Sequence, residues 1–171
     1  EVQLPAGHFF RAEAEFSPIE SAALDRCRGH VLDVGAGTGI HTLVLQRRGL
    51  QVSAVDVCPE AVSIMVEHGV KVARQADIMD FEGGPFDTLL MLGHGIGMVQ
   101  DLEGLDRFLD HARGLVHPGG QLLLDSLDVR RTDDPGHLAY HEVNRMAVRY
   151  FGETRLQFAC AGATGPMCGW L

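Results

Sequence analysis

One nine-residue stretch, Val31 to Gly39, limits more than any other what this chain can fold into. Its first four residues, VLDV, are typical of a buried strand, and glycines follow at positions 35, 37 and 39. Ile40 to Arg48 then has the pattern of a helix, and Gly49 is placed to end it. Because glycine lacks a side chain, such a strand–turn–helix unit brings bare backbone N–H groups against a ligand. The stretch therefore predicts a ligand-binding turn.

A second β-branched run, Val52 to Asp56, ends in an acid about twenty residues after the glycine turn. In nucleotide-binding βαβ units, the acid that ends the second strand accepts hydrogen bonds from ribose hydroxyls. Glycines after one strand and an acid at the end of the next together predict a nucleoside-containing ligand. That ligand would lie across both strand ends.

The dinucleotide fingerprint G-x-G-x-x-G fits this chain only in part. Gly35 and Gly37 match its first two glycines, but Ile40 stands where the third is required. Asp33 would also place a carboxylate beside a diphosphate, and like charges repel. A ligand that carries a positive group suits this acid better. An NAD(P)-dependent Rossmann oxidoreductase is therefore the less favoured alternative.

The stretches VLDVGAGTG and AVD together closely resemble class I S-adenosylmethionine-dependent methyltransferases, whose ligand carries a sulfonium and an amino group. QADIMD, FDTLLM and HPGGQLLLDS stand where that family has its later motifs, so the resemblance extends from about Ser17 to Asp128. It implies S-adenosylmethionine as cofactor, S-adenosylhomocysteine as product, and methyl transfer to a small-molecule acceptor by in-line displacement. A non-catalytic cofactor-binding module of the same fold is a further alternative.

The resemblance also implies which residues hold the cofactor. The glycine turn and Asp33 would bind the methionine end, Asp56 the ribose, and the pair Asp77 and Ile78 the adenine. For Asp77, the alternative role is only to cap a helix. The whole set implied in this way is Asp33, Gly35, Ala36, Gly37, Thr38, Gly39, Asp56, Val57, Asp77, Ile78, Leu92 and Gly93.

The loop after the fourth predicted strand departs from one branch of the family. Amino-group methyltransferases carry Asn/Asp-Pro-Pro-Tyr/Phe there, whereas this chain has Gly93-His94-Gly95, which weakens the case for a DNA-base or glutamine acceptor. His94 is a catalytic candidate on the acceptor side, because this strand end presents the methyl group and histidine titrates near neutral pH. The alternative is a histidine that only hydrogen-bonds the loop backbone.

The remaining pattern predicts an α/β fold with a doubly wound, mostly parallel sheet. Strands are expected at 31–34, 52–56, 70–75, 86–92 and 121–127, and helices at 18–27, 40–48, 58–68, 101–116 and 138–147. Residues 155–160 and 167–171, joined by a turn at 161–166, are expected to form an antiparallel hairpin. Ligands of such sheets bind beyond the carboxyl ends of the strands.

A single domain is expected over residues 1–171. It would comprise a lead-in or lid segment (1–16), a cofactor-binding core (17–128) and a substrate-side extension with the hairpin (129–171). Phe9, Phe10 and Arg11 would either fold over the cofactor or staple the next helix. We expect the hairpin to stay outside the main sheet and the family's closing C-terminal elements to be missing. The fifth strand would then have an open edge, which leaves a homodimer open as an option.

Composition and charge argue against several classes of binding partner. The formal charge of −9 argues against nonspecific nucleic-acid binding, which needs clustered Lys and Arg. No uninterrupted apolar run approaches the length of a membrane span. The histidines and cysteines show no metal-ligand spacing. These observations predict a cytoplasmic enzyme with no nucleic-acid partner, no membrane and no metal.

Overall fold

The computed structural model describes residues 5–160 and 163–170, which fall into two compact units. The first unit holds the residues up to Gly95 together with His111–Asp125, and the second holds Ile96–Asp110 together with the residues from Ser126 onward. Residues 1–4, 161–162 and 171 belong to the predicted lead-in segment and hairpin and lie outside the described residues. The single domain expected from the sequence stays a prediction. Within the described residues, no helix is both long and apolar enough to cross a membrane.

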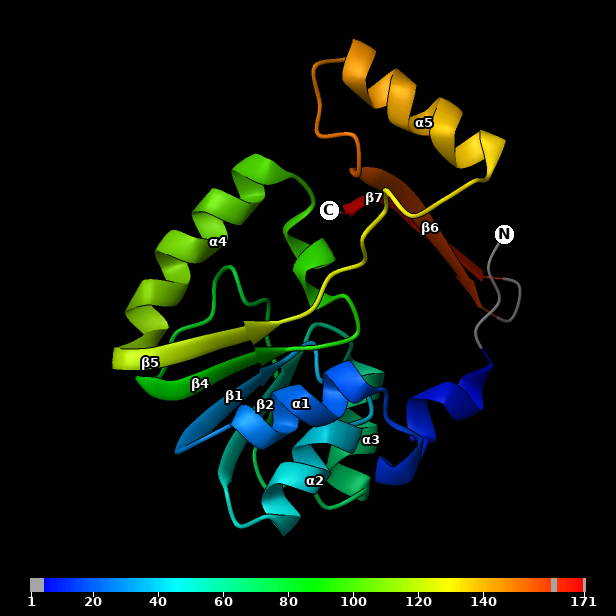
Figure 1. Cartoon of the computed structure of the whole chain (residues 1–171). Coiled ribbons are helices and arrows are strands. Elements are labelled where there is room, and N and C mark those ends of the chain that lie inside the picture. Colours follow the sequence, from blue (N-terminus) through cyan, green and yellow to red (C-terminus); the bar gives the residue numbers. More distant parts are fainter. Residues whose placement is uncertain (1–4, 161–162, 171) are drawn as a thin grey trace. The chain divides into compact units, whose positions relative to one another are not determined.

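The first unit is built on a five-stranded parallel sheet with the order β3-β2-β1-β4-β5 (Figure 1). Its strands are β1 (His30–Val34), β2 (Gln51–Asp56), β3 (Ala73–Gln75), β4 (Phe86–Met91) and β5 (Val116–Leu124). The strand order reverses beside β1, because β2 pairs on one side of it and β4 on the other. Such a reversal is the point at which open α/β sheets bind ligands. The predicted α/β fold is confirmed.

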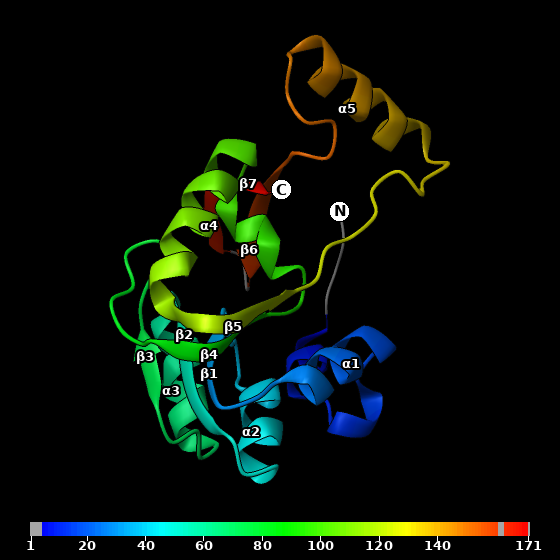
Figure 2. The same ribbon diagram turned by 60° about the vertical axis from the view of Figure 1, so that its left-hand side comes forward.

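Three helices cover one face of this sheet, as two views show: α1 (Pro18–Arg26), α2 (Ile40–Arg47) and α3 (Pro59–Glu67) (Figures 1 and 2). Strand side chains alternate between faces, and Val31 of β1 and Val52 of β2 lie on the helix side. There they form one buried cluster with Leu24 of α1 and Leu45 of α2. This packing fixes the start of α2 directly after the glycine turn.

Two strands of the main sheet, β3 and β5, differ from their predicted bounds by more than one residue. β3 begins at Ala73 instead of residue 70, because the N–H of Val70 donates to the carbonyl of Met65 and still belongs to the end of α3. β5 begins at Val116 and ends at Leu124, rather than spanning 121–127. Val116 already pairs with Phe86, and the register then shifts before pairing resumes further along β5.

The second unit contains most of the 3-10 turn η3 (Gly95–Val99), the first part of α4 (Leu102–Leu115), α5 (Pro135–Met146) and a two-stranded sheet. α5 begins three residues before the predicted start, because the Asp134 carboxylate accepts hydrogen bonds from the backbone N–H groups of Gly136 and His137.

The two strands of the second unit, β6 (Thr154–Cys160) and β7 (Ala163–Trp170), pair antiparallel with each other and not with the main sheet. The prediction of a separate hairpin is therefore confirmed. β7 is longer than predicted and takes in residues 163–166, which the sequence assigns to the turn. The other two turn residues, 161–162, lie outside the described part of the chain.

Candidate active site

The predicted cofactor residues of the first unit follow the carboxyl ends of neighbouring strands. The glycine turn follows β1, Asp56 ends β2, and Leu92 and Gly93 follow β4. Since these strands are parallel and adjacent, their carboxyl ends meet at one edge of the sheet. Asp77 and Ile78 follow β3 at the same edge.

The glycine turn is tied to β2 by its own backbone. The N–H groups of Gly35 and Ala36 donate to the carbonyl of Val55 at 2.9 and 3.1 Å, and the N–H of Gly39 donates to Ala36 at 2.9 Å. The sequence predicts bare N–H groups in this turn, and these three are instead satisfied within the protein. The reason is that the tight turn folds back onto the end of β2. The turn therefore offers no free donors at these three positions.

Two glycines after β1 and β4 have open space beside them. Gly37 has φ +57° and Gly93 has φ +71°, a conformation that favours glycine. A Cβ atom placed on either one would meet no heavy atom within 4 Å, so both backbones face open space. Gly39 has a different role, since a Cβ there would lie 2.8 Å from the Val70 side chain. It lets the start of α2 pack close to the end of α3.

Asp56 links the glycine turn to the end of β2. Its Oδ2 accepts the N–H of Gly37 at 2.8 Å, and its Oδ1 accepts the N–H of Cys58 at 2.9 Å. An ionised carboxylate has about four acceptor positions, so each oxygen keeps a lone pair for a ligand hydroxyl. The next residue, Val57, is mostly exposed beside it. Their assignment to the cofactor stays a prediction.

Asp33 lies inside the protein. It is two residues beyond Val31 on β1, so it points to the same face, toward α2. There it is 2% exposed, and the Thr42 hydroxyl donates to its Oδ2 at 2.5 Å. Burial raises the pKa of Asp33, although His41 and the Thr42 hydrogen bond oppose the shift. Its assignment to the positive end of a ligand stays a prediction.

For Asp77 and Ile78, the structure shows the capping role that was the alternative for Asp77. The Oδ1 atom of Asp77 accepts the N–H of Met79 at 2.9 Å, so this carboxylate does cap a turn. Asp77 is exposed, while the Ile78 side chain is 5% exposed. Binding of adenine by Asp77 and Ile78 stays a prediction.

Leu92 belongs to the buried cluster between the sheet and its helices.

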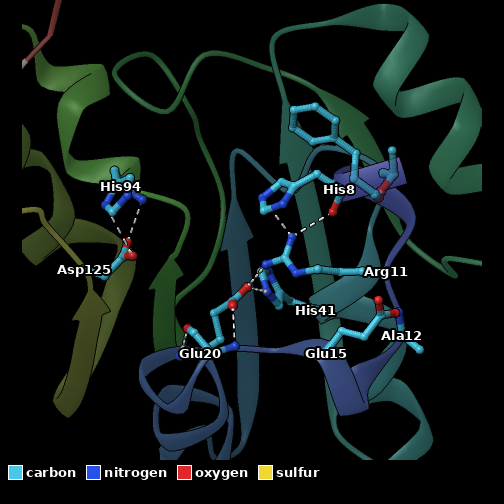
Figure 3. Close-up of polar contacts among 11 residues, drawn as sticks. His8, Arg11, Ala12, Glu15, Glu20, His41, His94 and Asp125 are labelled. Atoms are coloured by element: carbon cyan, nitrogen blue, oxygen red, sulfur yellow. Dashed lines mark hydrogen bonds and ion pairs between the residues drawn. The ribbon is translucent and has the colours of Figure 1, made fainter. Parts of the chain in front are cut away.

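The N-terminal segment is fastened to the glycine turn and to two helices. The Thr38 hydroxyl donates to the carbonyl of Phe9, at the end of the 3-10 turn η1 (Ala6–Phe10). Arg11 donates to the buried carboxylate of Glu20, and His41 Nε2 lies 2.8 Å from the same oxygen (Figure 3). That this segment closes over a cofactor stays a prediction.

Glu20 is the residue that links the N-terminal segment to α1 and α2. A capping box begins α1, since Glu20 Oε2 accepts the Ser17 N–H at 2.8 Å and the Ser17 hydroxyl accepts the Glu20 N–H. Although burial raises its pKa, hydrogen bonds from Ser17 and His41 and the charge of Arg11 hold the pKa of Glu20 below its ordinary value. The sequence shows the local cap but not the partners that come from distant segments.

His94 faces a carboxylate from the neighbouring strand end. Its N–H donates to Asp125 Oδ1 at 2.8 Å, and its Nδ1 lies 3.7 Å from Asp125 Oδ2 (Figure 3). The His94 side chain is 53% exposed and that of Asp125 is 12% exposed. His94 has φ +62°, an uncommon conformation for a residue with a side chain. No sequence pattern reveals this pairing of His94 with Asp125.

Comparison with known proteins gives a family match over most of the chain. A family model described as "Methyltransferase domain" matches residues 9–163. A ubiquinone biosynthesis O-methyltransferase from Xanthomonas oryzae pv. oryzae (strain PXO99A) is 31% identical over 116 residues, which are 63% of this chain and 47% of that protein. The corresponding protein of Xylella fastidiosa (strain 9a5c) is 27% identical over 106 residues. The chain thus spans about half the length of the curated relatives it matches.

Solved structures agree with this match. A SAM-dependent methyltransferase from Bacteroides fragilis, in complex with S-adenosyl-L-homocysteine, is 33% identical and has a TM-score of 0.83. The similarity covers 98% of this chain and 67% of that one. The sugar N-methyltransferase KedS8 from Streptoalloteichus sp ATCC 53650 is 19% identical, with a TM-score of 0.63 over 96% of this chain and 64% of the other. That second likeness supports the fold alone.

Proposed function

The chain belongs to the methyltransferase domain family, and from that membership we propose that it transfers a methyl group from S-adenosylmethionine to a small-molecule acceptor. Its 33%-identical structural relative binds S-adenosyl-L-homocysteine, the product that this reaction leaves behind. The curated relatives are O-methyltransferases, which supports an oxygen acceptor. Family membership favours this reaction over hydride transfer.

The open space at Gly37 and Gly93 is the observation that carries the proposal. These two glycines leave room after the ends of β1 and β4, and Asp56, the last residue of β2, has spare acceptor positions. A nucleoside fits this arrangement, with its ribose hydroxyls donating to Asp56. The methionine part would lie along the glycine turn, and Asp77 and Ile78 would hold the adenine. Residues that fit the cofactor are therefore present.

Bound S-adenosylmethionine would supply a methyl carbon that its sulfonium already activates. The chain's own contribution is then mainly orientation, which can provide about 7–11 kcal/mol of the barrier. The rigid strand ends suit this purpose, because the buried cluster beneath them fixes their positions.

The pair His94 and Asp125 is suited to receive a proton from the acceptor. The exposed imidazole projects from the end of β4, where this fold presents the methyl group, and Asp125 anchors its backbone and faces its Nδ1. With a carboxylate beside Nδ1, Nε2 becomes the nitrogen that accepts the proton. A hydroxyl acceptor fits this pair best, since it must lose a proton on methylation. Asp125 is here a positioning residue.

Turnover with candidate acceptors tests the proposal. The protein is incubated with S-adenosylmethionine and either small hydroxyl compounds, such as catechols and sugars, or their amine counterparts. S-adenosylhomocysteine and methylated product are then measured by mass spectrometry. We expect acceptor-dependent formation of both with a hydroxyl compound. Turnover with amines alone would overturn the oxygen acceptor. Binding of S-adenosylhomocysteine without turnover across the whole panel would favour the non-catalytic module.

A further inference from the structure

The second unit contains a pocket of about 390 Å³ outside the residues assigned to methyl transfer. Three segments line it: Gln100 and Asp101 before α4, the link from α5 into β6, and the facing part of β7. All of them belong to the same compact unit, so the pocket is a property of that unit. A pocket of this size holds a small molecule.

Two arginines, Arg149 and Arg155, supply the positive charge of this pocket. Within residues 5–160 and 163–170, neither guanidinium has an ion pair with a carboxylate, and the buried Nε of Arg149 has no hydrogen-bond partner. A guanidinium can only donate, and buried donors in native proteins are nearly always paired. This donor is therefore available to an acceptor on a bound molecule.

The two acids of the pocket are held by backbone donors instead. Asp101 Oδ1 accepts the N–H of Gly104 at 2.7 Å, which places it at the start of α4. Glu153 Oε1 accepts the N–H of Tyr150 at 3.3 Å. Their local hydrogen bonds direct these carboxylates to the backbone, which leaves the two arginines available to an anion.

Hydrogen bonds with α5 hold the backbone of the segment that contains Arg149. Asn144 of α5 is fully buried, and its amide donates to the carbonyls of Phe151 at 3.0 Å and Glu153 at 2.6 Å. The N–H of Arg149 donates to the Asn144 carbonyl at 2.9 Å. Val148, just before it, has φ +55°, which a β-branched residue rarely adopts. Such strain persists only where the surroundings impose it, and it is common at functional sites.

From the cavity, the unpaired arginines and their fixed backbone, we propose that this pocket binds the oxyanion of a small molecule, a carboxylate or a phosphate. The planar guanidinium matches both groups with two parallel hydrogen bonds. The chain as a whole carries a formal charge of −9, so attraction of an anion must come from a local pair such as this one. The proposal goes beyond methyl transfer, because it concerns a ligand site in the second unit that needs no cofactor.

Isothermal titrations with inorganic phosphate and, separately, with benzoate test the proposal at low and constant ionic strength. We expect saturable binding of at least one anion, and the one that binds identifies the oxyanion. Arg149→Met and Arg155→Met should each weaken that binding by about ten-fold or more. Arg107→Met is the matched control, since Arg107 is also an exposed arginine of the second unit and pairs with Glu103 outside the pocket. It should leave the affinity unchanged.

The variants remain informative if one of them misfolds. Arg155 is exposed on β6, so Arg155→Met should unfold at the same temperature as the wild type. Its affinity for the anion then tests the proposal even if the Arg149 variant misfolds. Failure of both anions to bind in saturable fashion, or binding that survives Arg155→Met, would overturn the proposal. A parallel titration with S-adenosylhomocysteine keeps the two proposals apart. If it alone fails, the proposed function is contradicted while the anion site stands.

Discussion

At the scale of single residues, the most specific proposed role is that of His94, which receives the acceptor's proton. Because its ring is exposed and its polar partner is Asp125 rather than the glycine turn, His94→Ala should leave S-adenosylhomocysteine affinity nearly unchanged. Turnover should fall by about a hundred-fold, as is usual when a general base is lost.

Asp125→Asn and His117→Ala complete this series. The Asp125 variant keeps an oxygen for the His94 N–H but loses the carboxylate charge near Nδ1, so it should lower turnover without abolishing cofactor binding. His117 is exposed in β5 and serves as the control histidine. Equal turnover in His94→Ala and wild type would show that His94 only shapes its loop.

Asp56 should dominate the affinity for the cofactor. Asp56→Ala removes charge-assisted hydrogen bonds worth about 1.5–3 kcal/mol, which corresponds to roughly a ten- to hundred-fold loss of S-adenosylhomocysteine affinity by calorimetry. Asp25→Ala, which removes an exposed acid of α1, is the control. Unchanged affinity in the Asp56 variant would mean that this carboxylate only holds the backbone of Gly37 and Cys58.

Asp33 should make the fold less stable at neutral pH than at acid pH. Its pKa is raised by burial, so between the ordinary and the raised pKa the folded state binds more protons than the unfolded state. The free energy of unfolding therefore falls as pH rises through that range. Asp33→Asn, which keeps the acceptor for Thr42, should be more stable than wild type at pH 7 in urea unfolding.

The pH dependence of that gain checks its cause. The advantage of Asp33→Asn should shrink as pH is lowered through the raised pKa toward the ordinary carboxyl range. Asp106→Asn, at an exposed position of α4, should show no comparable gain. A loss of stability at pH 7 in Asp33→Asn would contradict the assignment of a costly buried charge.

At the scale of elements, Glu20 joins the N-terminal segment to α1 and α2. Glu20→Ala removes its contacts with Arg11, His41 and Ser17, so the free energy of unfolding should fall by about 1.5–3 kcal/mol. Since the pKa of Glu20 is lowered, its contribution is present above the ordinary carboxyl pKa and lost as pH falls through the lowered value. Urea unfolding at neutral and acid pH measures both effects.

The exposed pair Glu103 and Arg107 on α4 is the control for that experiment. Glu103→Ala removes a surface ion pair and should cost only about 0.3–0.5 kcal/mol. Similar losses in the two variants would show that the Glu20 contacts add little beyond ordinary surface pairing.

The sequence predicts those parts of the fold that depend on neighbouring residues and misses those that depend on contacts between distant segments. The strand, turn and helix around VLDVGAGTG follow from apolar pattern and glycine spacing, so their positions are confirmed within a residue or two. The bonds of Gly35 and Ala36 to Val55 depend on which strand lies beside β1, and no local pattern encodes that. The start of β5 likewise depends on pairing between Val116 and Phe86. Asp125 meets His94 only once β4 and β5 are adjacent.

At the scale of the whole molecule, the two compact units have different chemical character. The first unit carries the glycine turn, Asp56 and the pair His94 and Asp125, and so holds every residue assigned to the cofactor or the acceptor's proton. The second carries the separate hairpin and the arginine-lined pocket. The sequence predicts the first unit well because family motifs fill it. The sequence does not predict the pocket, because Arg149 and Arg155 line it only once the chain has folded around Asn144.

Parallel calorimetric titrations with S-adenosylhomocysteine and NAD show directly which of the two cofactors the first unit binds. Both ligands carry an adenosine whose ribose could reach Asp56, but NAD attaches a diphosphate to that adenosine, whereas S-adenosylhomocysteine attaches an amino acid. Ile40 in place of a third glycine and the family match both favour S-adenosylhomocysteine. We predict saturable binding of S-adenosylhomocysteine and none of NAD. Tight binding of NAD with no response to S-adenosylhomocysteine would contradict the account.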